Sequence, residues 1–208
     1  MLVFIIEIIG TVAFASSGAM VGIRKKMDIF GVIVMAVMTA VGGGIIRDLV
    51  LGIHPPNTFK DPIYVEYSVA TAVILFVIFY IRKQMLDSKA MFYYERIMIL
   101  LDAIGLGAFT VIGVETAYEI GFVHHRFLLL FVGVITGVGG GMIRDMMAQQ
   151  IPFILVKQIY ACASLIGAGV CIWLMPYHKS ASMILGAVVV VIIRILAATY
   201  RWDLPKID

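Results

Sequence analysis

Charge is scarce in this sequence. Lysine, arginine, aspartate and glutamate make up only 14% of its 208 residues, whereas 62% of the residues are hydrophobic and the mean hydropathy is +1.04. Because roughly a quarter of the residues in soluble domains are charged, this composition excludes an ordinary soluble domain. The small net charge of +3 also excludes a nucleic-acid-binding protein, which needs a clustered basic region. We therefore predict an integral membrane protein.

Cysteine is equally scarce, and the only two are Cys162 and Cys171. They lie too far apart along one apolar stretch to bridge each other, and their spacing fits no zinc motif. Several enzyme motifs are absent too, namely H-E-x-x-H, the phosphate-binding Gly-Lys-Ser/Thr loop and G-x-S-x-G. We therefore expect no enzyme activity, no bound metal and no cofactor.

Seven apolar stretches have close to the ~20 residues that an α-helix needs to cross a bilayer. They are continuous, whereas a transmembrane β-strand alternates apolar and polar residues. We predict an all-α integral membrane protein with seven transmembrane helices, at residues 2–22, 29–52, 63–81, 97–118, 127–148, 153–175 and 182–199.

Lysine and arginine in the short connections indicate the orientation, because cytoplasmic loops are enriched in both. With seven crossings, one face of the membrane has Lys60, Arg126 and Lys179, while Lys157 near a helix start is assigned to neither face. The other face has Arg24, Lys25, Lys26, Arg82, Lys83, Lys89, Arg96, Arg201 and Lys206. We expect a multi-pass protein of the inner (plasma) membrane with its N-terminus outside and its C-terminus in the cytoplasm.

The string G-G-G-x-I-R-D occurs twice in the chain. Glycine destabilises a helix interior by roughly 0.8–1 kcal/mol relative to alanine, yet both triplets lie inside apolar stretches. We predict that Gly42, Gly43 and Gly44 break the second helix and that Gly139, Gly140 and Gly141 break the fifth. Close helix packing through small residues is the alternative.

A helix break at membrane depth has a chemical consequence. The backbone groups that it frees are tolerated only where they are buried in protein or line a water-filled path. Carbonyl groups before the first break, at residues 38–41, would present partial negative charge to a dehydrated cation. Two facing breaks could therefore line one passage in which backbone oxygen atoms replace the water shell of a transient monovalent cation.

An arginine and an aspartate follow each triplet: Arg47 with Asp48, and Arg144 with Asp145. A charge at the bilayer centre costs on the order of 2.5–3.5 kcal/mol, so these side chains should not face lipid. We expect each arginine to neutralise an acid or to bind freed carbonyl groups, and so to hold the path narrow. Neighbours on a helix point about 100° apart, so the arginine need not pair with the adjacent aspartate. The alternative is that both pairs lie near the surface and reach the headgroups.

A wider internal repeat surrounds the two strings. Aligning them pairs an acid, a glycine and a tyrosine of one half with those of the other: Glu7 with Asp102, Gly18 with Gly113, and Tyr64 with Tyr160. The units span residues 1–84 and 92–176 of a single transmembrane domain, with a polar linker at 82–89 and a seventh helix at 181–199. Since three crossings reverse the direction of entry, the units are expected to be inverted repeats.

Three further ionic residues lie in apolar stretches. Glu7 and Asp102 are close to the predicted starts of their helices, which would place one carboxylate at each mouth of a pore. A purely interfacial position for both is the alternative. For Arg194, in the last stretch, we expect contact with cytoplasmic headgroups rather than with a neighbouring subunit.

These features together resemble the prokaryotic branch of the trimeric intracellular cation (TRIC) channels, also catalogued as a bacterial glycine-transporter-type membrane domain. The resemblance rests on the seven helices, the inverted units and the doubled glycine string, and it covers nearly the whole chain. It implies a homotrimer in a lipid bilayer, a water-filled pore inside each protomer, and conduction of monovalent cations, chiefly potassium. It also implies glycine-induced kinks at residues 42–44 and 139–141.

Two transport functions remain open at this point, and a structural membrane protein without transport is a third possibility that no positive feature favours. A channel would pass potassium or sodium through a constriction at the triplets, gated by the nearby arginine and aspartate side chains. A secondary transporter would instead bind the ammonium and carboxylate groups of a small zwitterion such as glycine with the same backbone groups, while its inverted halves alternate access.

Overall fold

The computed structural model describes residues 1–81, 88–156, 159–200 and 202, with the side chains of all of these except 88–95 and 156. The predicted linker at 82–89 lies mainly outside this part of the chain, as do several basic residues behind the predicted orientation, such as Lys83 and Lys206. The regular structure of the described residues is helical, which confirms the all-α prediction. The helices are α1 (Leu2–Arg24), α2 (Ile29–Val50), α3 (Asn57–Lys60), α4 (Ile63–Ile81), α5 (Ser88–Glu119), α6 (Arg126–Met147), α7 (Phe153–Val156), α8 (Tyr160–Leu174) and α9 (Lys179–Tyr200).

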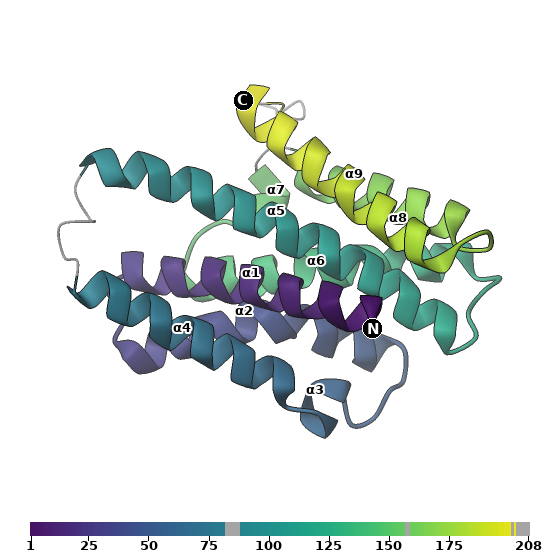
Figure 1. Ribbon diagram of the computed structural model, residues 1–208, viewed down its shortest axis with the longest axis horizontal. Helices are drawn as coiled ribbons and strands as arrows, with labels where there is room; N and C mark the ends of the chain where they lie inside the picture. The colour runs from purple at the N-terminus through teal and green to yellow at the C-terminus, as the bar shows by residue number, and fades with distance from the viewer. Residues whose placement is uncertain (82–87, 157–158, 201, 203–208) are drawn as a thin grey trace.

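The long helices lie side by side in one bundle (Figure 1). Helices α1 and α5 contact each other in the middle, α4 packs against α1 and α2, and α8 and α9 pack against α5 on the other side. Helix α1 and helix α5 run in opposite directions (Figure 1). This antiparallel arrangement is the one expected for the opening helices of two inverted units.

Six helices in the described part of the chain are long and apolar enough to cross a membrane. They are α1, α2, α4, residues Arg96–Glu119 of α5, α6 and α9. The prediction of an integral membrane protein is thereby confirmed, and the predicted limits of these six helices are close to the observed ones.

The predicted sixth crossing at residues 153–175 is not a single helix. The short helix α7 ends at Val156 and α8 begins at Tyr160, and Ile159 before it has a left-handed backbone with a φ of 45°. A left-handed residue cannot continue a right-handed helix. The 15 residues of α8 rise about 22 Å, less than the ~30 Å of the hydrocarbon core. The first unit has the same order, with the four-residue α3 before α4.

Both glycine triplets lie inside continuous helix. Helix α2 runs through residues 42–44 and helix α6 runs through residues 139–141 without interruption. The predicted break at each triplet is therefore wrong, because helical hydrogen bonds occupy the backbone groups that a break would have freed. Tertiary packing of the two helices outweighs the low helix propensity of glycine.

The triplets form the point at which α2 and α6 cross. A Cβ atom built on Gly43 would lie 2.2 Å from the Thr136 carbonyl oxygen, and one on Gly140 would lie 2.0 Å from the Thr39 carbonyl oxygen. Only glycine fits at such a distance from a neighbouring backbone. The structure therefore supports close packing through small residues, which was the alternative to a helix break.

The two units repeat a second contact as well. Gly18 of α1 meets the Thr39 hydroxyl of α2, and a Cβ atom there would lie 2.5 Å from it. Gly113 of α5 meets the Thr136 hydroxyl of α6, at 2.6 Å by the same measure. The sequence alignment of Gly18 with Gly113 thus corresponds to one helix contact made twice.

We predict that Gly140→Ala lowers the stability of the protein, because the new methyl group collides with the backbone of α2. The matched control is Gly169→Ala in α8, where a Cβ atom has no neighbour within 4 Å. Alanine at that position should stabilise the helix by up to about 1 kcal/mol. Thermal unfolding of the purified variants in detergent measures both effects. A Gly140→Ala variant as stable as wild type would contradict the close crossing.

Candidate functional site

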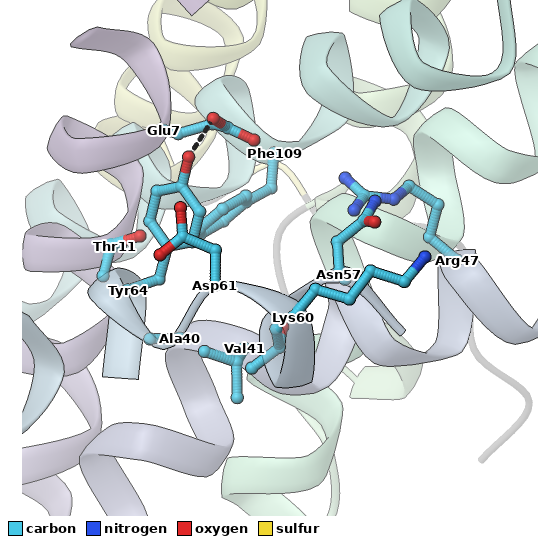
Figure 2. Close-up of a pocket in the computed structure, with 12 residues that line it drawn as sticks. Glu7, Thr11, Ala40, Val41, Arg47, Asn57, Lys60, Asp61, Tyr64 and Phe109 are labelled. Atoms are coloured by element: carbon cyan, nitrogen blue, oxygen red, sulfur yellow. Dashed lines mark hydrogen bonds between the residues drawn. The ribbon is translucent and has the colours of Figure 1, made fainter. Parts of the chain in front are cut away.

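A polar cavity of about 310 Å³ lies mainly in the first unit, between α1, α2, α3 and α4, with Phe109 of α5 also in its wall (Figure 2). It reaches the glycine crossing, because Gly44 of α2 lies in its wall. Its lining consists of Glu7, Thr11, Ala40, Val41, Gly44, Arg47, Asn57, Thr58, Lys60, Asp61, Tyr64 and Phe109. A cavity of this size and polarity can hold several water molecules or a small solute.

The ionic side chains of the cavity are separated by sign. Figure 2 shows Glu7, Tyr64 and Asp61 on one side, and Arg47 and Lys60 on the other. The Tyr64 hydroxyl donates a hydrogen bond to the Glu7 carboxylate. Glu7 is therefore held in place by α4 and lines the cavity.

Arg47 pairs with its own neighbour, which the sequence analysis did not require. Its Nε donates to the Asp48 carboxylate at 2.8 Å, and Asp48 is fully buried. The second carboxylate oxygen of Asp48 accepts a hydrogen bond from the backbone N–H of Asn57 at 2.7 Å. Asp48 thus ties the end of α2 to the start of the short helix α3.

The second unit repeats this arrangement at Asp145. One of its oxygens accepts from Arg144 Nε at 2.9 Å, and the other accepts from the Phe153 amide at 2.9 Å. The aspartates of the two strings therefore hold the loops that follow α2 and α6. In both halves, this contact between the aspartate and the following loop is a structural one.

Arg144 is bound more extensively than Arg47. Its Nη1 donates to Asp102 and to the Ser17 hydroxyl, each at 2.6 Å, and its Nη2 lies 2.8 Å from Asp145. The exposed fraction of Arg144 is only 1%. The expectation that this arginine neutralises an acid is confirmed, and the alternative of a surface position is excluded for it.

The position of Asp102 in its helix differs from the predicted one. Helix α5 begins at Ser88, so Asp102 lies about four turns inside it and not near its start. With an exposed fraction of 1% it forms no open mouth in this conformation, and it pairs with Arg144 instead. The carboxylates of Glu7 and Asp102 occupy aligned positions but have different surroundings.

Arg194 does not reach the headgroups, so that expectation is wrong. Its exposed fraction is 2%, and its guanidinium carbon lies 4.5 Å from the centre of the Tyr160 ring. Its Nη2 is 3.9 Å from Asp102 Oδ2. The reason is that α9 packs against α5 and α8, so Arg194 faces the interior.

The third glycine of each triplet lies beside the charged cluster of its unit. A Cβ atom on Gly44 would meet only Arg47 Nη2, at 3.8 Å, whereas one on Gly141 would lie 2.8 Å from the Tyr160 hydroxyl. The middle glycines contact the opposite helix instead. The third glycines therefore leave room beside Arg47 and Arg144.

Comparison with known proteins places this geometry in a family. A family model described as Glycine transporter matches the chain twice, over residues 4–80 and 99–176. The UPF0126 inner membrane protein YadS of Escherichia coli K12 is 39% identical, over 99% of this chain and 96% of that protein. A crystal structure of a prokaryotic TRIC channel in 0.5 M KCl has a TM-score of 0.88 and 34% identity, over 98% of this chain and 99% of that one. The TRIC orthologue from Rhodobacter sphaeroides has a TM-score of 0.85 and 31% identity, over 96% and 98% of the two chains.

The chain belongs to the prokaryotic TRIC family. The resemblance drawn from the doubled glycine string is thereby confirmed. The solved members of the family are described as channels, which agrees with the expectation that this protein is not an enzyme.

Sequence reasoning missed several residues of this TRIC-family site. No specific role was assigned to Ser17 from the sequence, although it accepts a hydrogen bond from Arg144 across the unit boundary. Tyr64 and Tyr160 were aligned with each other but given no role. Their aligned positions, next to aligned acids and arginines, were the signal that could have identified both.

We predict that Arg144→Met destabilises the protein much more than Arg47→Met. The first change leaves Asp102 and Asp145 buried without their common partner, and breaking such a pair costs about 3–5 kcal/mol. The second change deprives a single buried carboxylate, Asp48, of its arginine, and Asp48 keeps its hydrogen bond from the Asn57 backbone N–H. Thermal unfolding in detergent compares the two variants, and equal losses would argue against the different roles assigned to the two arginines.

Proposed function

We propose that this protein is a cation channel of the bacterial inner membrane that conducts chiefly potassium, and also sodium, without a cofactor. One solved relative is described as a TRIC cation channel, and another is described as a prokaryotic TRIC channel in 0.5 M KCl. The observation that carries the proposal is the polar cavity of the first unit, which extends from Glu7 to Gly44 at the α2–α6 crossing.

The charge of the cavity favours cations. Arg47 is balanced by Asp48 at 2.8 Å. The remaining ionic groups in the lining are Glu7, Asp61 and Lys60, which together carry one net negative charge. Since an excess of one sign in a narrow mouth concentrates ions of the opposite sign, this mouth attracts cations.

The proposed path continues along both triplets, Gly42, Gly43 and Gly44 with Gly139, Gly140 and Gly141. It then meets the buried cluster of the second unit. The ionic residues Glu7, Arg47, Asp48, Asp102, Arg144 and Asp145 form the proposed network that controls it. Conduction requires the close crossing of α2 and α6 to loosen, so the observed conformation corresponds to a closed channel.

We further propose the membrane arrangement in full. Helix α8 completes seven crossings together with α7, and the units at 1–84 and 92–176 are inverted repeats with 181–199 appended. The protein forms a homotrimer with one pore in each protomer, as one solved relative is described as trimeric. Its N-terminus lies outside and its C-terminus in the cytoplasm.

A bilayer recording tests this function through Glu7. Under a potassium chloride gradient, we expect unitary currents that reverse near the potassium potential. Glu7→Gln should lower the unitary conductance by about twofold in 0.05 M salt and little in 1 M salt, because the Debye length falls from roughly 14 Å to 3 Å. Tyr64→Phe removes the hydrogen bond and keeps the carboxylate, so its conductance should stay close to that of wild type.

Glu66→Gln is the control for a general effect of carboxylate loss. Glu66 is exposed on the same helix α4 and does not belong to the cavity lining. An equal loss of conductance in Glu66→Gln, or a loss in Glu7→Gln that does not depend on salt, would contradict the role of Glu7. Absence of any unitary current from the wild-type protein would contradict the channel itself.

The second candidate function is a carrier for a small zwitterion such as glycine. The specific observation in its favour is the separation of charge in the cavity, with Glu7 and Asp61 facing Arg47 and Lys60 (Figure 2). An ammonium group fits the first pair and a carboxylate fits the second. The helix ends that would have bound these groups at the triplets do not exist, because both helices are continuous.

Uptake of labelled glycine into proteoliposomes distinguishes the two functions. A carrier gives saturable uptake without unitary currents, and Lys60→Gln would raise the concentration needed for half-maximal uptake. A channel gives potassium currents and no saturable glycine uptake. The second result is the one that we expect.

A further inference from the structure

One buried ionic residue, Arg194, belongs to neither of the two repeated units. Arg194 belongs to α9, at Lys179–Tyr200, whereas the family model matches only residues 4–80 and 99–176. Internal symmetry therefore provides no counterpart of this arginine in the first unit. Its guanidinium group nevertheless lies in the buried cluster of the second unit, beside Asp102 and Tyr160.

The position of α9 is fixed by close backbone contacts. A Cβ atom on Gly107 of α5 would lie 2.8 Å from the Ala187 carbonyl oxygen, and one on Gly167 of α8 would lie 2.8 Å from the Gly186 carbonyl oxygen. Small residues thus bring α9 directly against α5 and α8. Arg194, about two turns beyond these contacts, has its depth set by them.

Arg194 changes the charge of the second cluster. Without it, Asp102, Asp145 and Arg144 carry one net negative charge, and the aligned residues Glu7, Asp48 and Arg47 carry the same charge in the first unit. With it, the four buried side chains of the second cluster are neutral as a set. The first unit has a polar cavity at this place, and the second has side chains that are 1–2% exposed.

The two arginines of the second cluster lie at different distances from Asp102. Arg144 donates to Asp102 and Ser17 at 2.6 Å and contacts Asp145 at 2.8 Å, so it is part of the scaffold. Arg194 lies 3.9 Å from Asp102 Oδ2, which is longer than a hydrogen bond, and it stacks on Tyr160. No donor among the described residues hydrogen-bonds to that oxygen. Arg194 therefore faces Asp102 as a nearby opposite charge.

We propose that Arg194 is a tethered counter-ion, which occupies the place of the permeant cation beside Asp102 and keeps the second half of the path closed. This inference rests on the proposed cation channel. Opening requires the guanidinium group to leave Asp102, after which a potassium ion balances the negative charge of the cluster. The seventh helix then has a function beyond packing, since it provides the charge that the repeated units lack.

A charge cycle in planar bilayers tests the proposal. Arg194→Gln leaves a net charge of −1 in the cluster and is expected to raise the open probability about tenfold, since a unit charge about 4 Å away dominates the local potential at an effective ε of about 20. Asp102→Asn leaves +1 and should lower the potassium current below that of wild type. The double variant D102N/R194Q is neutral again and should return toward wild type. Arg194→Lys keeps the charge and is the matched conservative control.

A purely structural role for Arg194 predicts a different pattern. Loss of packing would impair both Arg194→Gln and the double variant, and the current would not follow the net charge of the cluster. Either that pattern or an Arg194→Gln channel with wild-type open probability overturns the inference. If Arg194→Gln does not fold, Asp102→Asn decides, because an unchanged or larger potassium current in that variant also overturns it.

The proposed function fails in a distinguishable way. If the wild-type protein and all four variants give no unitary current while they remain folded by size-exclusion chromatography, the cation channel is overturned and the inference with it. If the wild-type protein conducts potassium and the charge cycle fails, only the role of Arg194 is overturned.

Discussion

The structure depends on one constraint, the crossing of α2 and α6 at backbone contact. In lipid no hydrophobic force drives helices together, so close packing and polar contacts must do so. Gly43 and Gly140 allow the approach, because a Cβ atom on either would lie within 2.2 Å of a carbonyl oxygen of the opposite helix. The crossing also sets the depth of Arg47 and Arg144, which follow the triplets on the same helices. Buried charge and tight packing are thus parts of one arrangement.

The two halves share their backbone contacts and differ in their electrostatics. Each has an arginine that pairs with the next aspartate, and each aspartate holds a short helix. In the first half an acid accepts a hydrogen bond from a tyrosine hydroxyl, and a polar cavity lies beside the arginine. In the second half the aligned acid, Asp102, binds Arg144 and faces Arg194. The first unit therefore contains a polar cavity, and the second contains a neutral, buried cluster at the aligned positions.

Much of the fold could be predicted from the sequence, because a membrane helix is marked by a long apolar run. The ends of these runs lie close to the observed ends of the six long helices. The repeat was predictable from aligned residues, and Gly18 and Gly113 indeed make the same contact in their units. The division of residues 153–175 into α7 and α8 was not, since Ile159 carries no local signal for its left-handed backbone. The continuity of the triplets was missed because glycine propensity is a local quantity, whereas the helices are stabilised by their neighbours.

The sequence predicted which ionic residues belong to the candidate site, but it did not predict which of them form pairs. Glu7, Asp102 and the two Arg-Asp strings were recognised from charge in apolar segments, and all of them lie in the cavity or in buried ion pairs. Composition and pattern alone determined a helical membrane protein with a doubled polar motif, since every charge in lipid must find a partner. Which partner each charge finds was decided by the tertiary structure. Ser17 and Arg194 reach Arg144 and Asp102 only because α1 and α9 pack against helices remote in the sequence. The packing of the helices sets the distances between charges on different helices, and these distances determine the electrostatic energies.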